Sequence, residues 1–377
     1  MILGIDAFNL RTGGGITHLV EFLKAAKPLE QGFSKVILWG SESTLNQVTD
    51  KDWLQKKSNF WLQGGLAKRV FWHLFLQRRE AIYSGCSVIL VPGGSSSSGF
   101  VPSVTMSRNM LPFEWTEIRR YGFSFFTIKL ILLRLSQIYS FRRAQGVIFL
   151  TEYAKQKVTR IARLSKKNHI KIPHGINERF FQDPSSRHCR EFTVKNPCKL
   201  IYVSIISPYK HQCVVAEAIA ILRHKGYHLT MSFVGPKGIG WKRLNSTIKI
   251  LDPNNTFLSY DGKVPYENLP KLYSKKDIAV FASSCENLPN ILLECMASGL
   301  PIACSKNGPM PEILSSAGVY FDPTNPNSIA QALIKLMNSP YLRFNYSKLA
   351  YSNARKFSWE KTSQKTLKYL AKIAKDK

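Results

Sequence analysis

Short apolar runs alternate with helical segments through the second half of this 377-residue chain, and this alternation constrains the fold more than any other feature. The runs that we expect to be strands are 198–206, 229–235, 256–262, 277–283, 301–305 and 318–321. The run IAVFA is apolar at every position, as expected of a strand that helices cover on both faces. Alternation of this kind, with Gly or Pro in the turns, predicts a parallel sheet between two layers of helices.

The first half of the chain repeats the pattern less regularly. Its expected strands are 2–6, 35–40, 87–91, 101–106, 146–150 and 169–173, and its clearest helices are 16–26 and 153–164. The predicted fold class is therefore α/β, with two doubly wound Rossmann-like domains that face each other across a cleft. Ligands of open α/β sheets bind outside the carboxyl ends of the strands, so this cleft is the expected site.

The domain boundaries follow from a polar stretch that carries proline and lacks apolar periodicity. We predict a first domain at 1–185, a linker at 186–197 and a second domain at 198–355. The tail 356–377 is expected to form an amphipathic helix that packs back toward the first domain.

Basic residues outnumber acidic ones by 53 to 24, which gives a formal net charge of +29. Such an excess favours an anionic partner: a phosphorylated substrate, an acidic membrane surface or a nucleic acid. We expect no nucleic acid, because no recognised binding motif accompanies the charge. The segment 123–139 is rich in Phe and Leu, with Lys129 and Arg134 between them. It is expected either to be a core helix whose basic side chains reach water or to lie on anionic lipid.

The chain shows no sign of secretion or of metal binding. Its start, MILGIDAFNL, has no basic region or cleavage site, so we expect a first strand there and not a signal peptide. The seven cysteines lack zinc spacing, which predicts free thiols in a reducing compartment. Asp50 and Asp52 fit a D-x-D pattern but lie in a polar turn. We therefore expect a surface loop there, no metal and no cofactor.

The segment 284–301 carries the residues with the clearest chemistry. Glu286 follows an expected strand, and Glu294 lies about five residues into the next helix, roughly 7–8 Å along its axis. Pro289 suits the first helical position and Gly299 suits the C-terminal cap. The helix between them is otherwise apolar, so Glu294 should be buried and should need hydroxyl or N–H partners.

The backbone N–H groups near 288–290, where this helix begins, form a natural anion site. The sequence ENLPNILLECMASGLPI resembles the donor-site motif of retaining glycosyltransferases of family four, which have the GT-B fold. Further resemblances to that family are SPYK at 207–210, GPMPEIL at 308–314, GVYFDP at 318–323 and, in the first half, GGGITH at 13–18.

The resemblance implies a role for each matched residue. As catalytic residues, Glu286 would bind donor-sugar hydroxyls and stabilise positive charge at the anomeric carbon, and Lys210 would neutralise the diphosphate leaving group. Glu294 would bind the ribose hydroxyls of the nucleotide. The substrate-binding residues that the resemblance implies are Gly14, Gly15, Ser207, Asn287, Leu288, Pro289, Asn290 and Glu294.

Two positions depart from the family pattern. Ile205 stands where many members carry a second cation for the diphosphate, so either Lys210 acts alone or Lys237 substitutes. Arg108 stands where many members carry His, which leaves the acceptor side and the sugar contacts open.

The resemblance implies a retaining, metal-independent hexosyltransferase that moves a sugar from a nucleoside diphosphate sugar to a hydroxyl of a saccharide or lipid-linked acceptor. The expected setting is lipopolysaccharide, O-antigen or capsule assembly in the cytoplasm, at the inner face of the cytoplasmic membrane. An anionic membrane surface would then be a further partner. Two alternatives stay open: a nucleotide-sugar epimerase of GT-B shape, and a non-catalytic basic protein that binds membrane or nucleic acid.

Overall fold

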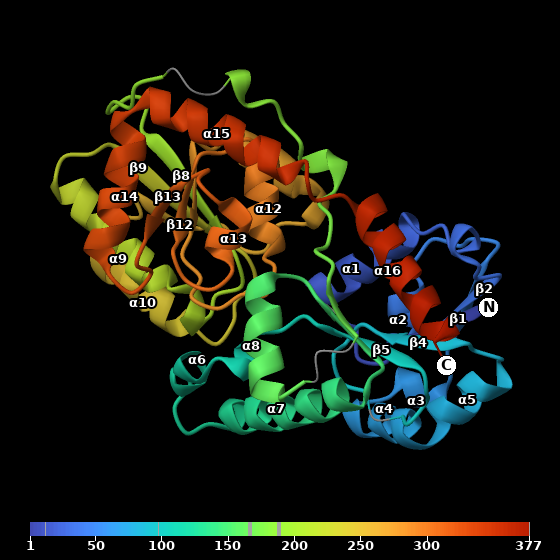
Figure 1. The fold of residues 1–377 in the computed structure, drawn as a ribbon. Coiled ribbons are helices and arrows are strands. Elements are labelled where there is room, and N and C mark those ends of the chain that lie inside the picture. The colour runs from blue at the N-terminus through green and yellow to red at the C-terminus, as the bar shows by residue number, and fades with distance from the viewer. Residues whose placement is uncertain (12, 97, 165–167, 187–189, 377) are drawn as a thin grey trace. The chain divides into compact units, whose positions relative to one another are not determined.

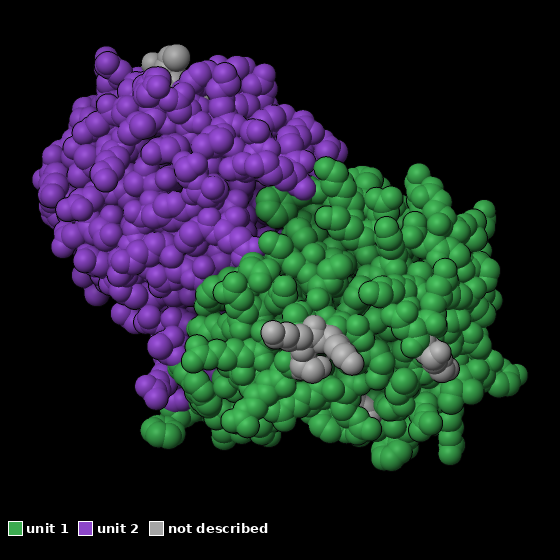
Figure 2. All heavy atoms as spheres, viewed as in Figure 1, with its two compact units in different colours: residues 1–115, 123–175, 357–377 green, residues 116–122, 176–356 purple. Residues whose placement is uncertain are grey.

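The computed structural model describes residues 1–11, 13–96, 98–164, 168–186 and 190–376, and the chain forms two compact units (Figures 1 and 2). Unit 1 comprises residues 1–115, 123–175 and 357–377, and unit 2 comprises residues 116–122 and 176–356.

The chain leaves unit 1 at residue 175, before the predicted linker 186–197. Phe180 accounts for this difference, because its buried ring lies 5.2 Å from the Tyr266 ring and 6.2 Å from the Tyr273 ring of unit 2, measured between centroids. The described part of the linker belongs to unit 2, whereas residues 187–189 lie outside the described residues.

Unit 1 is built on a parallel sheet of seven strands in the order β3-β2-β1-β4-β5-β6-β7. The strands are β1 (Ile2–Asp6), β2 (Lys35–Trp39), β3 (Leu54–Lys57), β4 (Val88–Val91), β5 (Ser103–Ser107), β6 (Gly146–Phe149) and β7 (His169–Lys171). The helices are α1 (Gly14–Lys24), α2 (Glu42–Leu45), α3 (Phe60–Gln63), α4 (Leu66–Phe71), α5 (Gln77–Tyr83), α7 (Phe125–Arg143), α8 (Glu152–Ala162) and α16 (Trp359–Lys375), while α6 (Trp115–Arg119) leads into the 116–122 segment. Among the described strands of unit 1, β3 alone was not expected, because its sequence LQKK is polar, as the edge of a sheet permits.

The C-terminal helix α16 completes unit 1 by packing against α1 and β4 (Figure 1). Its apolar positions, among them Trp359, Leu367 and Leu370, are buried. The Trp359 ring stacks on His174 at 5.6 Å and meets the edge of His18 at 5.3 Å. Residues from both ends of the chain therefore share one core.

Unit 2 is built on a parallel sheet of six strands in the order β10-β9-β8-β11-β12-β13. The strands are β8 (Cys198–Val203), β9 (Leu229–Val234), β10 (Leu258–Tyr260), β11 (Ile278–Phe281), β12 (Ile302–Ser305) and β13 (Val319–Phe321). The helices are α9 (Gln212–His224), α10 (Trp241–Leu251), α11 (Leu269–Ser274), α12 (Asn290–Ala297), α13 (Met310–Leu314), α14 (Pro326–Asn338) and α15 (Pro340–Ala354).

The strand order of unit 2 reverses between β8 and β11. From β8 the chain runs through α9 to β9 on one side, and from β11 it runs through α12 to β12 on the other. Crossovers between parallel strands are right-handed, so α9 and α12 cover opposite faces of the sheet (Figure 1). The loops after β8 and β11 thus leave the same edge in opposite directions, which is where open α/β sheets bind ligands.

One of our two expectations for 123–139 was a core helix, and α7 does not match it. Its side chains of Phe125, Leu132 and Leu135 are exposed to solvent, so the core-helix interpretation is wrong for this face. None of the helices in the described ranges is both long and apolar enough to cross a membrane.

We predict that Gly175→Ala destabilises unit 1. A Cβ atom on Gly175 would lie 2.2 Å from the backbone nitrogen of Trp359 and 2.6 Å from the carbonyl carbon of Ser358, so α16 would have to move. We expect a loss of about 1–3 kcal/mol in the free energy of unfolding, measured by urea denaturation. Gly65→Ala is the control, since its Cβ would meet no atom within 4 Å, and it should change stability by about 0.5 kcal/mol or less. Equal stability of the two variants would contradict the close approach.

Candidate active site

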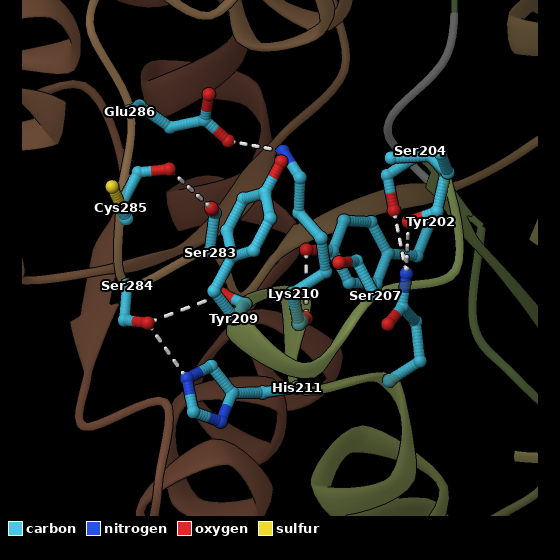
Figure 3. Close-up of polar contacts among 12 residues, drawn as sticks. Tyr202, Ser204, Ser207, Tyr209, Lys210, His211, Ser283, Ser284, Cys285 and Glu286 are labelled. Carbon is cyan, nitrogen blue, oxygen red and sulfur yellow. Dashed lines mark hydrogen bonds and ion pairs between the residues drawn. The ribbon is translucent and has the colours of Figure 1, made fainter. Parts of the chain in front are cut away.

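Two loops of unit 2 meet at the reversal of strand order and are joined by hydrogen bonds (Figure 3). The loop after β11 contributes Ser284, whose backbone N–H donates to the Tyr209 carbonyl at 2.9 Å. The Ser284 hydroxyl donates to the same carbonyl at 3.2 Å and lies 2.9 Å from Nε2 of His211. The loop after β8 is therefore fixed against the loop that carries Glu286.

The turn after β8 is shaped by its own backbone. Pro208–Lys210 forms a single 3-10 turn, and His211 follows in the left-handed conformation at φ 53° before α9 begins. The Tyr202 hydroxyl donates to the Lys210 carbonyl at 2.9 Å. The Gln212 amide donates to the Ser204 hydroxyl at 2.7 Å and to the Ile205 carbonyl at 2.9 Å. These bonds hold the backbone of Lys210 in one position.

The two predicted catalytic residues form an ion pair in this structure. Nζ of Lys210 contacts Oε1 of Glu286, and the two side chains are only 6% and 15% exposed (Figure 3). The Lys210 ammonium also lies 5.1 Å from the Tyr209 ring centroid and 5.6 Å from that of Phe281. Burial is the largest single influence and would lower the pKa of Lys210, but the attraction and hydrogen bond of Glu286, together with Tyr202 and Cys285, leave this pKa above its usual value. Lys210 is therefore a permanent cation at neutral pH.

His211 is neutral at neutral pH. Burial, together with repulsion from Arg120, lowers the pKa of His211 to about 4. Nε2 of His211 shares one hydrogen bond with the Ser284 hydroxyl at 2.9 Å. The ring joins the two loops without adding charge.

Glu294 is deeply buried in α12, as expected, at 2% exposure. Its Oε2 accepts a hydrogen bond from the Tyr273 hydroxyl at 3.1 Å, which supplies one of the partners that a buried carboxyl needs. Burial raises the pKa of Glu294 to about 7. Gly299 follows the helix at φ 62°, as expected for a residue after the C-cap.

The other residues predicted in this loop lie at the start of α12. Asn287, Leu288 and Pro289 are buried, and Asn290 is the first helical residue. Pro289 is the N-cap and not the first helical residue, so the helix begins one residue later than we predicted. The 288–290 backbone thus forms the beginning of a helix next to the Lys210–Glu286 pair.

Ser207 lies in the turn after β8, and its hydroxyl is 3.1 Å from the Tyr121 hydroxyl. Ile205, which replaces an expected cation, is 44% exposed. Lys237 lies over the Trp241 ring, with Nζ 4.5 Å from the centroid, so this lysine is engaged on the loop after β9.

Gly14 and Gly15 belong to unit 1, where they open α1 after the left-handed Gly13 at φ 72°. The Arg108 guanidinium donates to the carbonyls of both residues, at 3.3 Å for Gly15. Arg108 therefore holds the glycine turn of unit 1, a contact that the sequence did not suggest.

Several site residues escaped the sequence analysis. Tyr202 lies in β8 and Tyr273 in α11, and the apolar pattern of each element is enough to explain an aromatic residue there. Nothing in the sequence therefore indicated that either hydroxyl belongs to the site. His211 could have been noticed because it follows Lys210 directly, but its bond to Ser284 spans 73 positions of sequence.

Within the described residues, no group of three or more His, Cys, Asp or Glu side chains is placed to hold a metal ion. Asp50 is highly exposed and pairs with Lys56 at 2.7 Å, as a surface turn should. The six described cysteines are free, and Cys189 lies outside the described residues.

Residues 189–357 match the family model of glycosyl transferases group 1. This part of the chain belongs to that family. The match spans most of unit 2, so the predicted resemblance is confirmed where the two loops and both glutamates lie.

Relatives of this glycosyl transferase segment include O-antigen chain mannosyltransferase B of Escherichia coli, 30% identical over 29% of this chain and 29% of that protein. Spore coat protein SA of Bacillus subtilis is 26% identical over 45% of this chain and 47% of its own length. The chain spans less than half the length of these curated relatives.

Solved structures of glycosyltransferases share the fold over nearly the whole chain. Sucrose-phosphate synthase of Thermosynechococcus elongatus is 14% identical with a TM-score of 0.74, covering 97% of both chains. WaaG, a glycosyltransferase involved in lipopolysaccharide biosynthesis, is 13% identical with a TM-score of 0.69, covering 98% of this chain and 99% of its own. With the two parallel sheets, these neighbours confirm the predicted GT-B fold class.

We predict that stability falls as pH rises from about 4.5 to 7, because of Glu294. In the unfolded chain this carboxyl loses its proton near its usual pKa of 4.5, whereas the folded protein keeps the proton to about pH 7. Across that window the folded protein binds more protons than the unfolded chain. Each pH unit therefore lowers the free energy of unfolding by up to about 1.4 kcal/mol. Urea unfolding at pH 5 and pH 7 should show a loss of about 2 kcal/mol that Glu294→Gln abolishes.

Glu267→Gln is the control for this pH dependence, because Glu267 is an exposed carboxyl of the same unit. It should keep the slope of the unsubstituted protein. A Glu294→Gln protein with an unchanged slope would show that another group titrates.

Proposed function

We propose that this protein is a retaining glycosyltransferase that moves a hexose from a nucleoside diphosphate sugar to a hydroxyl acceptor. The observation that carries the proposal is the buried Lys210–Glu286 pair beside the start of α12, at the reversal of strand order. A fixed cation, a carboxylate and helix N–H groups at one sheet edge suit an anionic leaving group bound to a sugar.

In the proposed reaction the bond between the anomeric carbon and the diphosphate oxygen breaks, and negative charge grows on the diphosphate. Lys210 and the N–H groups at the start of α12 meet that charge, and preorganised groups of this kind usually give the largest catalytic contribution. Glu286 binds sugar hydroxyls and stabilises the positive charge at the anomeric carbon. We assign no protein nucleophile: the acceptor hydroxyl attacks on the face that the diphosphate leaves, and its proton passes to the departing diphosphate oxygen. Lys210 supplies the positive charge, so we propose a reaction independent of metal.

The donor and the pathway are proposed from the relatives. Structural neighbours with 15–17% identity, the HepE protein of Anabaena, were solved with UDP and with UDP-glucose. The Escherichia coli relative is named for O-antigen chains and WaaG for lipopolysaccharide biosynthesis. We therefore propose a nucleotide-sugar donor, with Glu294 on the ribose, and a saccharide or lipid-linked acceptor in surface polysaccharide assembly.

We further propose that unit 1 lies on the inner face of the cytoplasmic membrane through α7. Phe125, Ile128, Leu132, Leu135 and Tyr139 are 84, 56, 61, 59 and 46% exposed. Their spacing of three and four residues puts them on one face of the helix. The segment 123–143 contains four basic residues and no acidic one. An apolar stripe among cations suits a bilayer with anionic lipid.

Glu286→Gln should abolish sugar transfer while leaving the protein folded but less stable, because Lys210 loses its counter-charge. Loss of one charge-stabilising group is expected to lower kcat by about 100-fold or more. The assay uses the nucleotide sugar that raises the unfolding temperature most among a panel of such donors, with thermal unfolding of the variant as the folding check. Glu267→Gln, an exposed carboxyl of unit 2, should transfer at the normal rate.

Each alternative gives a different result in this assay. An epimerase would convert the donor without any acceptor, and a non-catalytic binder would show only salt-dependent binding that Glu286→Gln leaves intact. Turnover of Glu286→Gln at the wild-type rate would refute the catalytic assignment.

The α7 stripe should be needed for membrane binding. The triple variant Phe125→Ser, Leu132→Ser, Leu135→Ser is expected to bind vesicles containing phosphatidylglycerol about tenfold more weakly in co-sedimentation, since less apolar surface is buried. The matched control replaces three exposed apolar residues of unit 2, Val194, Ile250 and Tyr341, by Ser. Vesicles of phosphatidylcholine alone should bind poorly. Equal binding by both triple variants would exclude α7 as the contact.

A further inference from the structure

Unit 2 contains a cavity of about 590 Å³ on the α9 side of the turn after β8. Its lining residues are Arg120, Ile206, Ser207, Pro208, His211, Gln212, Cys213, Val214, Ile239, Gly240, Arg243 and Thr324. Neither member of the Lys210–Glu286 pair lines it, and nor does Glu294. The cavity is therefore a separate site that shares a turn with the proposed donor site.

The lining of this cavity is cationic. It contains Arg120 and Arg243 and no acidic residue. Nε of Arg120 donates to the Glu117 carboxylate at 2.8 Å. The two terminal amino groups of Arg120 form no hydrogen bond or ion pair with a described residue. The Arg243 side chain makes neither an ion pair nor a hydrogen bond with a described residue. Two guanidinium groups thus keep most of their donors available.

Two helix starts add to this positive character. α9 and α10 begin in the lining, at N-caps His211 and Gly240; the His211 side chain does not cap α9, and Gly240 has no side chain that could cap α10. The first N–H groups of a helix have no partner within it. A Cβ atom on Gly240 would lie 3.2 Å from the Ser207 backbone, so the start of α10 packs tightly against the turn. Both helices direct their positive ends toward one space.

The rest of the lining is uncharged. Ile206, Pro208, Val214 and Ile239 are apolar, and His211 is neutral at neutral pH. A ligand that fits this lining has an anionic head and a neutral carbon body. A phosphate monoester offers three terminal oxygens and up to two negative charges to the two guanidinium groups, whereas a carboxylate offers two oxygens and one charge.

We propose that this cavity binds a phosphate monoester, with its phosphate held by Arg120 and Arg243 and its carbon body against Ile206, Pro208 and Ile239. The inference does not depend on the proposed transfer reaction, because neither arginine is assigned to the donor; of the substrate-binding residues that the resemblance implies, Ser207 alone also lines the cavity. The phosphate could belong to a small soluble ester or to a lipid headgroup, and the two sources share this chemistry.

The test uses the full chain and two phosphate probes. Isothermal titration with glycerol 3-phosphate represents the soluble ester, and vesicles of phosphatidic acid in phosphatidylcholine represent the lipid. Arg243→Gln, which removes a guanidinium that makes no hydrogen bond or ion pair with a described residue, should weaken binding at least tenfold, and the double variant Arg120→Gln, Arg243→Gln should abolish it. Glycerol, which lacks the phosphate, should not bind.

The matched control is Arg223→Gln with Arg355→Gln, which removes two arginines of unit 2 outside the lining and should bind as the unsubstituted protein does. The nucleotide sugar should still stabilise the double variant Arg120→Gln, Arg243→Gln, which separates this site from the donor site. Binding to either probe that depends on Arg243 supports the proposal and identifies the source. Absence of binding to both probes, or equal binding by Arg243→Gln, would overturn it.

Discussion

A lysine that is almost entirely removed from water stays charged only when an anion lies against it, and in unit 2 this anion is Glu286. The pair joins residues separated by 76 positions in the sequence. Around it, Tyr202 fixes the Lys210 backbone, and the His211–Ser284 bond fixes one loop on the other. The neighbouring hydrogen bonds therefore keep the cation and the carboxylate in register before any ligand arrives.

Lys210 and Glu286 are charged side chains that are both largely buried, which is unusual in proteins. Removing one partner would leave an uncompensated charge, so the arrangement is expensive to break. A sugar diphosphate can share both charges, since its phosphate oxygens suit the ammonium and its hydroxyls suit the carboxylate. On the proposed function, the phosphate oxygens and hydroxyls of the donor would take over contacts that Lys210 and Glu286 make with each other.

Much of the fold could be predicted because buried parallel strands require unbroken apolar runs, as in β11, and turns require Gly or Pro. The same logic failed for β3, where an edge position tolerates LQKK, and for α7, where Phe and Leu suit a core as well as a solvent-exposed stripe. Glu286, Lys210 and Glu294 could be found from local sequence. Their partners could not, since the Lys210–Glu286 pair depends on β8 and β11 being neighbours and the Glu294–Tyr273 bond depends on how α11 packs beside α12.

Unit 1 is assembled from three separate stretches of chain, and its final helix carries Trp359 into contact with His18 and His174. In chain order α16 follows the whole of unit 2, so the ribosome synthesises it after that unit. α16 covers a surface of α1 and β4. During translation this surface stays exposed until α16 has been synthesised. The nascent protein can therefore fold unit 2 before the core of unit 1 is complete, because that core closes only when α16 packs on α1 and β4.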